Sequence, residues 1–174
     1  GVTVTVDALL AEFDAVVLSG GAELPRDLDL PPHELEGIHF AMDFLSQQNK
    51  RVAGDSEERA APKGTISAKG LHVVVIGGGD TGSDCVGTSN RQQAKSVTQF
   101  ELLPQPPRER TPYMPWPTYP MILKTTSSHE EGADRQWAIG TKAFIGDENG
   151  NLKGLRIVDL DWETAKDGRP AKFV

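Results

Sequence analysis

Six consecutive residues in the middle of the chain have the types and spacing of a loop that binds phosphate through its backbone. These residues are Gly77, Gly78, Gly79, Asp80, Thr81 and Gly82. They follow the apolar run 73–76, and a Gly-x-Gly-x-x-Gly pattern after a strand is typical of dinucleotide-binding proteins. The glycine pattern taken alone is explained equally well by an ordinary strand-to-helix turn. The flanking segments are needed to distinguish a dinucleotide-binding loop from such a turn.

Each glycine of the pattern has a physical role in phosphate binding. Gly77 allows the tight turn out of the strand, Gly79 lets the backbone approach a pyrophosphate, and Gly82 lets the following helix lie close to the sheet. The start of that helix adds unpaired N–H groups and the positive end of its dipole. We expect Asp80 or Thr81 to cap the helix. No cationic side chain is then required at the phosphates.

The segments on both sides of the loop indicate a strand-helix-strand unit. Residues 73–76 are an apolar run of the kind that is buried in a parallel sheet, residues 80–93 are predicted to be helical, and residues 96–103 are typical of a second strand. The helix contains many poor helix formers, so packing against the sheet must hold it. Its predicted sheet-facing side consists of small residues, namely Thr81, Gly82, Cys85, Val86 and Ser89.

The end of the second strand is predicted to select the nucleotide. Glu101 follows Gly77 at about the spacing expected of a ribose-binding acid. A carboxylate there accepts hydrogen bonds from a free 2′-hydroxyl and repels a 2′-phosphate, which favours NADH. Arg108 and Arg110 lie a few residues further on, where their guanidinium groups either hold the 2′-phosphate of NADPH or line a solvated loop. The sequence leaves both cofactors open.

Composition and charge argue against several classes of function. The 174 residues carry a net charge of −7 and a pI near 5.1, which argues against nucleic acid or an anionic membrane as the main partner. A single cysteine, Cys85, provides neither an intrachain disulfide nor a four-cysteine iron–sulfur site. The four histidines lack the spacing of metal ligands, so we predict no metal site. No apolar stretch is long enough to span a bilayer and no signal peptide is visible, so we expect a cytoplasmic protein.

The first part of the chain is interpreted as the remnant of another domain. Within residues 1–36, the pattern predicts a strand at 2–6, a short helix at 8–13 and a buried strand at 15–18. No further segment among these residues completes a sheet for the two strands. We therefore expect them to belong with residues outside this chain.

Residues 37–174 are predicted to form the nucleotide-binding domain. It begins with an amphipathic helix at 38–48, which is followed by a charged, proline-containing stretch at 50–69 that we expect to be a mobile surface connection. A second irregular segment, 104–135, is rich in proline and aromatic residues. It is either a structural loop packed by Trp116 or a cover over the cofactor or a surface for another domain.

The last part of the chain is predicted to be antiparallel. Residues 137–145 and 152–162 read as two strands, and the Asn149-Gly150 step between them favours a hairpin. A further strand is expected to begin at Lys172. The fold class predicted from the whole chain is therefore α/β, with a Rossmann-like parallel sheet, flanking helices and a small antiparallel β-meander.

Several longer strings resemble one family, the small or beta subunit of glutamate synthase. The strings are FDAVVLSGGAELPR at 13–26, GIHFAMDFL at 37–45, VVVIGGGDTGSDCVGTSN at 73–90, FELLPQPP at 100–107, PWP at 115–117, SSHEEG at 127–132 and TKAFIG at 141–146. They are much more specific than the glycine pattern, and together they cover nearly the whole chain.

The resemblance implies a role in an FAD and iron–sulfur oxidoreductase of glutamate biosynthesis. In that family the small subunit passes hydride from NADPH, or NADH in some members, to FAD, and 4Fe-4S clusters carry the electrons to the large or alpha subunit. By resemblance the glycine loop holds the nicotinamide nucleotide, while Gly20 and Gly21, within residues 19–22, lie beside the flavin. In this chain Gly20 stands where the family usually has threonine.

Two features of the family are missing from this sequence. The cysteine-rich cluster region and the glycine motif that binds FAD are both absent. The chain is therefore expected to bind NAD(P)H and to require the rest of the small subunit and the large subunit for turnover. Its task is to position the nicotinamide, and no acid, base or nucleophile is assigned.

Three alternatives remain at this stage. The chain could serve another flavin or iron–sulfur oxidoreductase of related architecture. It could be a non-catalytic dinucleotide-binding or docking module. The glycine loop could also seat FAD instead of the nicotinamide nucleotide, although its place after the flavin-type segment at 19–22 argues against this.

Overall fold

A computed structural model describes residues 3–18, 20–21, 24–32, 34–62, 64–112, 114, 117, 122–165 and 169–173. Trp116, which packs the proline-rich segment in one of its two interpretations, lies outside these residues. The elements, in chain order, are α1 (Val6–Glu12), α2 (Ala41–Val52), α3 (Glu57–Ala60), β1 (His72–Ile76), α4 (Gly79–Arg91), β2 (Ser96–Glu101), α5 (Ser127–Glu130), β3 (Asp134–Trp137), β4 (Ile139–Gly146), β5 (Leu152–Asp159), β6 (Trp162–Thr164) and β7 (Pro170–Phe173).

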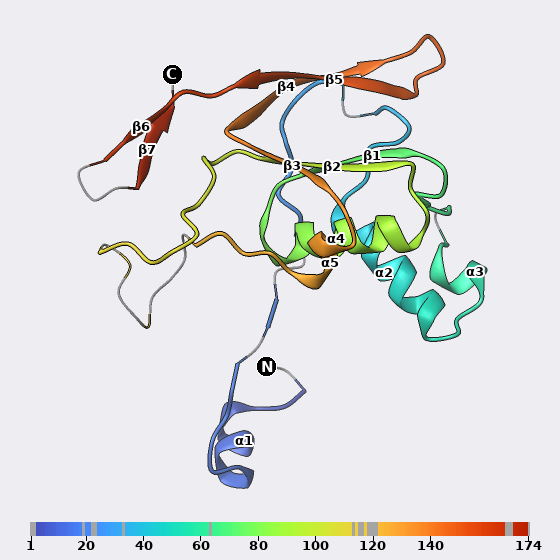
Figure 1. Ribbon diagram of the computed structural model, residues 1–174. Helices are drawn as coiled ribbons and strands as arrows, with labels where there is room; N and C mark the ends of the chain where they lie inside the picture. Colours follow the sequence, from blue (N-terminus) through green and yellow to red (C-terminus); the bar gives the residue numbers. More distant parts are fainter. Residues whose placement is uncertain are drawn as a thin grey trace.

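A parallel sheet with the strand order β1-β2-β3 forms the centre of the molecule. Helices α2, α4 and α5 cover one face of this sheet, and the β4–β5 hairpin lies on the other side (Figure 1). The β1-α4-β2 unit is the strand-helix-strand unit that the sequence predicts. The fold class is therefore confirmed as Rossmann-like α/β with small antiparallel sheets.

Packing holds α4, as its poor helix propensity requires. Cys85 belongs to the buried cluster with Phe44 and Leu45 of α2, and Val86 is fully buried. The predicted sheet-facing side is wrong at Thr81, which is exposed. A second side of α4 is also buried, because the short helix α5 packs there and leaves no room for a side chain at Gly87.

The apolar run 73–76, predicted to be of the kind buried in a parallel sheet, is covered on one face only. Val73 and Val75 pack against the helical cluster. Val74 and Ile76 point to the other face and remain 42% and 39% exposed. The hairpin above the sheet contacts β2, so it leaves the outer face of β1 more open.

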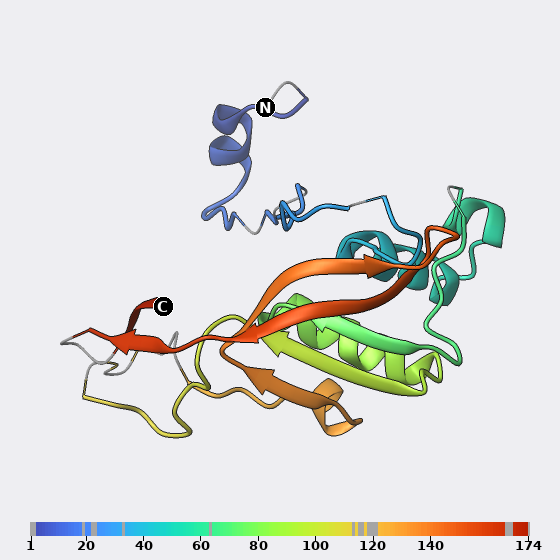
Figure 2. The same ribbon diagram turned by 90° about the horizontal axis from the view of Figure 1, so that it is seen from above.

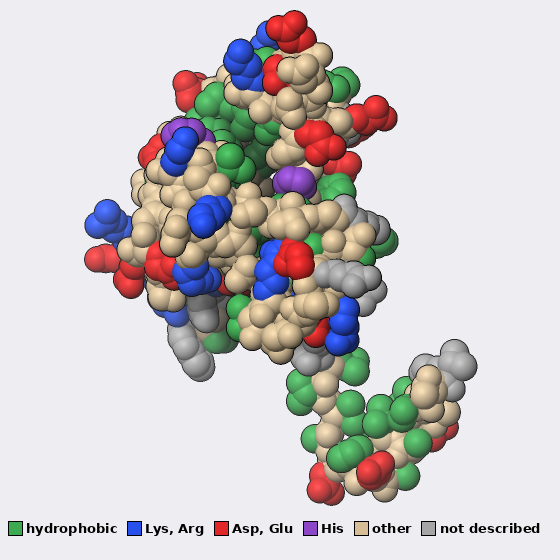
Figure 3. Space-filling view, turned by 90° about the vertical axis from the view of Figure 1, so that its right-hand side faces the viewer, with side chains coloured by type: hydrophobic (Ala, Val, Ile, Leu, Met, Phe, Trp, Pro, Cys, Tyr) green, Lys and Arg blue, Asp and Glu red, His purple; other side chains and the backbone are tan. Residues whose placement is uncertain are grey.

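The N-terminal segment differs most from the sequence-based expectation. Helix α1 is present, and the hydroxyl of its N-cap Thr5 accepts a hydrogen bond from the Ala8 N–H at 3.2 Å. Within the described residues, neither 3–6 nor 15–18 forms a strand, and Val17 and Leu18 are 86% and 92% exposed. A strand needs a neighbour for its backbone hydrogen bonds, and these residues have none beside them. The segment extends away from the body with its apolar side chains uncovered (Figures 2 and 3).

The stretch 50–69 is more ordered than its composition predicts. Helix α2 extends to Val52, beyond the predicted end at residue 48, and α3 follows it. Gln47 of α2 donates a hydrogen bond to the Gly64 carbonyl at 3.0 Å and accepts one from the Ile66 N–H at 3.0 Å. These bonds tie the stretch to α2, so it packs on the domain.

The antiparallel part begins at a sharp bend. Residues 137–145, predicted as one strand, are divided between β3 and β4 at Ala138, whose φ is +56°. This left-handed residue takes the chain out of the parallel sheet and into the hairpin. The turn between β4 and β5 is the predicted one, with Gly150 at φ +80° and the Asp147 carboxylate accepting hydrogen bonds from the Asn149 and Asn151 N–H groups.

The segment predicted to end the first domain also contacts this hairpin. Glu36 forms a parallel bridge to Asn151: its N–H donates to the Gly150 carbonyl at 2.9 Å, and its carbonyl accepts from the Leu152 N–H at 2.8 Å. Beyond β5, the predicted strand 152–162 is interrupted, and β6 pairs with β7 in a separate antiparallel sheet. Among the described residues, no helix is both long enough and apolar enough to cross a membrane.

Candidate functional site

The glycine loop lies at the edge of the sheet where all three parallel strands end, to the left in Figure 1. The Gly77 N–H donates to the Phe100 carbonyl at 2.8 Å, which ties the start of the loop to β2. Gly77 and Gly79 have φ values of +112° and +76°, a region that glycine adopts without steric cost. A Cβ at either position would meet nothing within 4 Å, so the outer side of the loop is open.

Gly82 has the opposite surroundings. A Cβ there would lie 2.7 Å from the Gly77 carbonyl oxygen and 2.9 Å from the side-chain nitrogen of Gln99. Only a residue without a side chain lets α4 approach the loop this closely. The third glycine of the pattern thus serves close packing, whereas the first two serve the turn and the open surface.

The helix behind the loop begins without a side-chain cap. Its N-cap is Gly78, which makes no side-chain hydrogen bond, and α4 starts at Gly79. The expectation that Asp80 or Thr81 is the cap is therefore wrong, because both residues already lie in the first helical turn. The first N–H groups of a helix lack intrahelical partners and favour an anion. No side-chain cap competes for them here.

Glu101 ends β2 directly beside the loop. A Cβ at Gly78 would lie 2.6 Å from the Glu101 carboxylate carbon, so this carboxylate touches the loop backbone. Arg135 of β3 donates to Glu101 from Nη2 to Oε1 at 3.0 Å, and the two side chains are only 15% and 18% exposed. The Arg135 guanidinium also lies over the Trp137 ring at 5.0 Å. The Arg135–Glu101 ion pair therefore links β3 to the end of β2 beside the glycine loop.

Arg135 was missed because the predicted irregular segment ends at residue 135. The signal that could have found it is a short third strand, Asp134–Trp137, which runs parallel to β2. In that register Trp137 lies opposite Glu101, which places Arg135 on the same face of the sheet as Glu101.

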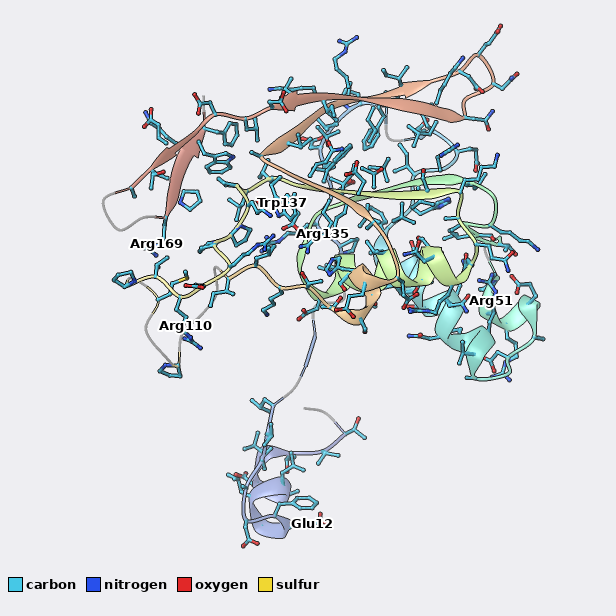
Figure 4. All side chains as sticks on the ribbon, in the orientation of Figure 1. Glu12, Arg51, Arg110, Arg135, Trp137 and Arg169 are labelled. Atoms are coloured by element: carbon cyan, nitrogen blue, oxygen red, sulfur yellow. The ribbon has the colours of Figure 1, made fainter. Side chains whose placement is uncertain are left out.

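The structure does not bring the two loop arginines to this pair. Arg108 and Arg110 are exposed on the segment after β2. Figure 4 shows Arg110 on that segment, well separated from Arg135. The segment starts at the site, since it directly follows Glu101. Its first residue is held by the Trp162 indole N–H of β6, which donates to the Leu102 carbonyl at 3.0 Å.

Gly20 and Gly21 belong to the N-terminal segment, which Figure 2 shows extending away from the sheet and its helices. A Cβ at either position would meet nothing within 4 Å. Ser19 and Ala22, the other two residues of that motif, are outside the described residues.

Two titratable groups of the sheet-and-helix unit have shifted pKa values. Burial raises the pKa of the Cys85 thiol to about 11, which keeps it protonated and unreactive. Burial and the nearby Arg135 charge lower the pKa of His129, although Glu101 opposes them. In the part of the chain that the structure describes, no three His, Cys, Asp or Glu side chains gather as metal ligands would.

A parallel sheet with flanking helices and a glycine-rich loop at the end of its first strand defines a Rossmann-like α/β class of fold. No protein-family model matches the chain. It is 45% identical, over 99% of its length, to a protein of Mycobacterium tuberculosis named as an NADPH glutamate synthase small chain. It is 48% identical over 95% of its length to an NADH glutamate synthase of Schizosaccharomyces pombe, and 41% identical over 92% to an NADPH glutamate synthase small chain of Bacillus subtilis.

The chain is therefore homologous, along nearly its whole length, to one region of glutamate synthase small chains. This confirms the resemblance predicted from the sequence strings. The chain spans 34% of the length of the M. tuberculosis protein, 33% of the B. subtilis protein and 8% of the S. pombe protein.

Proposed function

We propose that the chain binds NADPH or NADH at the loop formed by residues 77–82. One observation carries this proposal: the open glycine loop and the uncapped first turn of α4 lie together at the carboxyl edge of the parallel sheet. Nucleotides bind at this edge in open α/β sheets. The residues fit a pyrophosphate because Gly77 and Gly79 present bare backbone outward, where a side chain would fill the space.

The choice between the two nucleotides is proposed to depend on Glu101 and its partner. A carboxylate beside the loop accepts hydrogen bonds from the free 2′-hydroxyl of NADH. Arg135 neutralises this carboxylate at 3.0 Å and so weakens its repulsion of a 2′-phosphate. Relatives named for NADPH and for NADH both occur, which agrees with a site that does not strongly exclude either.

The wider role follows from the relatives. We place the chain in the small subunit of glutamate synthase, an oxidoreductase of glutamate biosynthesis in the cytoplasm. A bound nicotinamide supplies hydride, and the residues of this chain bind and orient it toward FAD. Gly20 and Gly21 would then lie beside the flavin. The partners are the rest of the small subunit, with its FAD and 4Fe-4S clusters, and the large subunit. The chain by itself would bind nucleotide without turnover.

Calorimetric titrations of the chain with NADPH and with NADH test the proposal. We expect the 174-residue chain to bind at least one of the two. Glu101→Ala should weaken NADH binding, and the double variant Arg108→Ala with Arg110→Ala should weaken NADPH binding if those arginines reach the 2′-phosphate. Glu148→Ala, at an exposed position of the hairpin turn, is the control. A chain that binds neither nucleotide while it is folded would refute the proposal and favour a docking module.

A further inference from the structure

A buried glutamine connects the glycine loop to a motif that the proposed site does not use. Gln99 of β2 is fully buried, on the helix-facing side of the sheet. Its side-chain nitrogen donates to the Gly77 carbonyl at 3.0 Å. Its side-chain oxygen lies 3.1 Å from Nε2 of His129, which belongs to the SSHEEG string at 127–132. One side chain thus touches both segments.

The directions of these hydrogen bonds follow from their partners. The Thr126 backbone N–H donates to Nδ1 of His129 at 3.2 Å, so Nδ1 is an acceptor and carries no proton. The proton of the neutral ring is therefore on Nε2, which donates to Gln99 Oε1. With its oxygen engaged in this way, the Gln99 amide presents its nitrogen to the Gly77 carbonyl. These hydrogen bonds form one series that runs from the Thr126 N–H through His129 and Gln99 to the Gly77 carbonyl.

The far end of the series is anchored on α4. The Thr126 and Ser83 hydroxyls form a short hydrogen bond, and Thr126 with His129 makes a capping box at the start of α5. A Cβ at Gly87 would lie 2.8 Å from the Ser128 Cβ, so α5 lies directly on α4. The imidazole is therefore held by the helix that begins at the glycine loop.

We infer that Gln99 and His129 are positioning residues, which hold the Gly77 carbonyl and with it the loop in the conformation that receives the dinucleotide. The inference rests on the proposed function, since it concerns the same loop. Gly77 is the residue at which the chain turns from β1 toward α4, and its carbonyl also meets the position where Gly82 lacks a side chain. A fixed carbonyl there sets the distance between the loop and the helix.

The charges around His129 keep it in the form that the series needs. Burial and the charge of Arg135 on β3 lower the pKa of His129, and the charge of Glu101 on β2 opposes them. The ring is then neutral at neutral pH, with one donor and one acceptor. A protonated ring would present a second N–H to the Thr126 N–H and lose that hydrogen bond.

The experiment compares two glutamines of similar burial in the full chain. Gln99→Met keeps the length of the side chain and removes both hydrogen bonds. Gln47→Met is the matched control, because Gln47 is also buried and also bonds to backbone, at Gly64 and Ile66, away from the glycine loop. For each variant, dissociation constants for NADPH and NADH and the urea midpoint are measured.

We expect Gln99→Met to raise the dissociation constant about tenfold, which corresponds to roughly one hydrogen bond. Gln47→Met should lower the urea midpoint and leave the dissociation constant unchanged. If Gln99→Met and Gln47→Met lose stability alike and both bind like wild type, the role of Gln99 is structural and the inference is overturned. If wild type itself binds neither nucleotide, the proposed function and this inference fail together.

A second pair of variants tests the other end of the series. His129→Gln retains an N–H that can reach Gln99 Oε1, whereas His129→Leu does not. Binding by His129→Gln close to that of wild type, with about tenfold weaker binding by His129→Leu, would support the series of hydrogen bonds. Equal affinities for the two variants would overturn it, even if Gln99→Met does not fold.

Discussion

Alanine at position 82 tests how closely α4 must approach the glycine loop. The added methyl group would lie 2.7 Å from the Gly77 carbonyl oxygen and 2.9 Å from the Gln99 side-chain nitrogen. Ordinary contacts begin near 3.4 Å, so the helix or the loop must move by roughly 0.5–0.7 Å. The backbone of Gly77 cannot rotate away as a flexible side chain would.

The expected size of the effect follows from three contributions. Overpacking of this kind costs about 1–3 kcal/mol. Loss of the Gln99 hydrogen bond to Gly77 adds about 1 kcal/mol. Alanine is favoured over glycine inside a helix by about 1 kcal/mol, which offsets part of the loss. We therefore expect Gly82→Ala to lower the free energy of unfolding by about 1–3 kcal/mol and to weaken nucleotide binding by more than about tenfold.

Urea unfolding and NADPH and NADH titrations at one temperature measure both effects. Gly154→Ala is the control, because a Cβ at that position in β5 would meet nothing within 4 Å. The control should bind normally and unfold at the same urea concentration or a slightly higher one. Wild-type stability and affinity in Gly82→Ala would refute the argument that close packing of α4 on the loop creates the site.

Three other outcomes follow from contacts outside the loop. The Arg51 and Thr65 hydrogen bonds hold the pKa of Glu57 at about 2, below its ordinary 4.5, so its charge stabilises the fold above pH 4.5 and this contribution is lost as the pH falls toward 2. In urea unfolding at pH 2–5, Glu57→Gln should therefore show a shallower pH dependence than wild type, and parallel curves would contradict this. Cys85, with its pKa raised to about 11, should react with a disulfide reagent at pH 8 only after unfolding, and rapid reaction of the native chain would disagree. Trp162→Phe removes the hydrogen bond to the Leu102 carbonyl and should lower the free energy of unfolding by about 0.5–1.5 kcal/mol, whereas an unchanged urea midpoint would show that the bond is dispensable.

The β1-α4-β2 unit and its glycine loop could be predicted from the amino-acid sequence alone. These elements depend on short-range information: an apolar β-branched run, glycines at positive φ, and a helix lined with small residues. The turn at Gly150 and the helix α1 were likewise predictable, because turns and caps are local. The homology to glutamate synthase small chains was also visible in the sequence strings.

The identity of the side chains that meet at the loop depends on how the elements pack in three dimensions. Arg135 reaches Glu101 because a third parallel strand lies beside β2. This strand ends at Trp137, just before Ala138, whose positive φ no sequence pattern predicts. His129 reaches Gln99 across a separation of 30 residues. Such pairs depend on strand order and on the packing of α5 against α4, and periodicity along the chain carries no information about either.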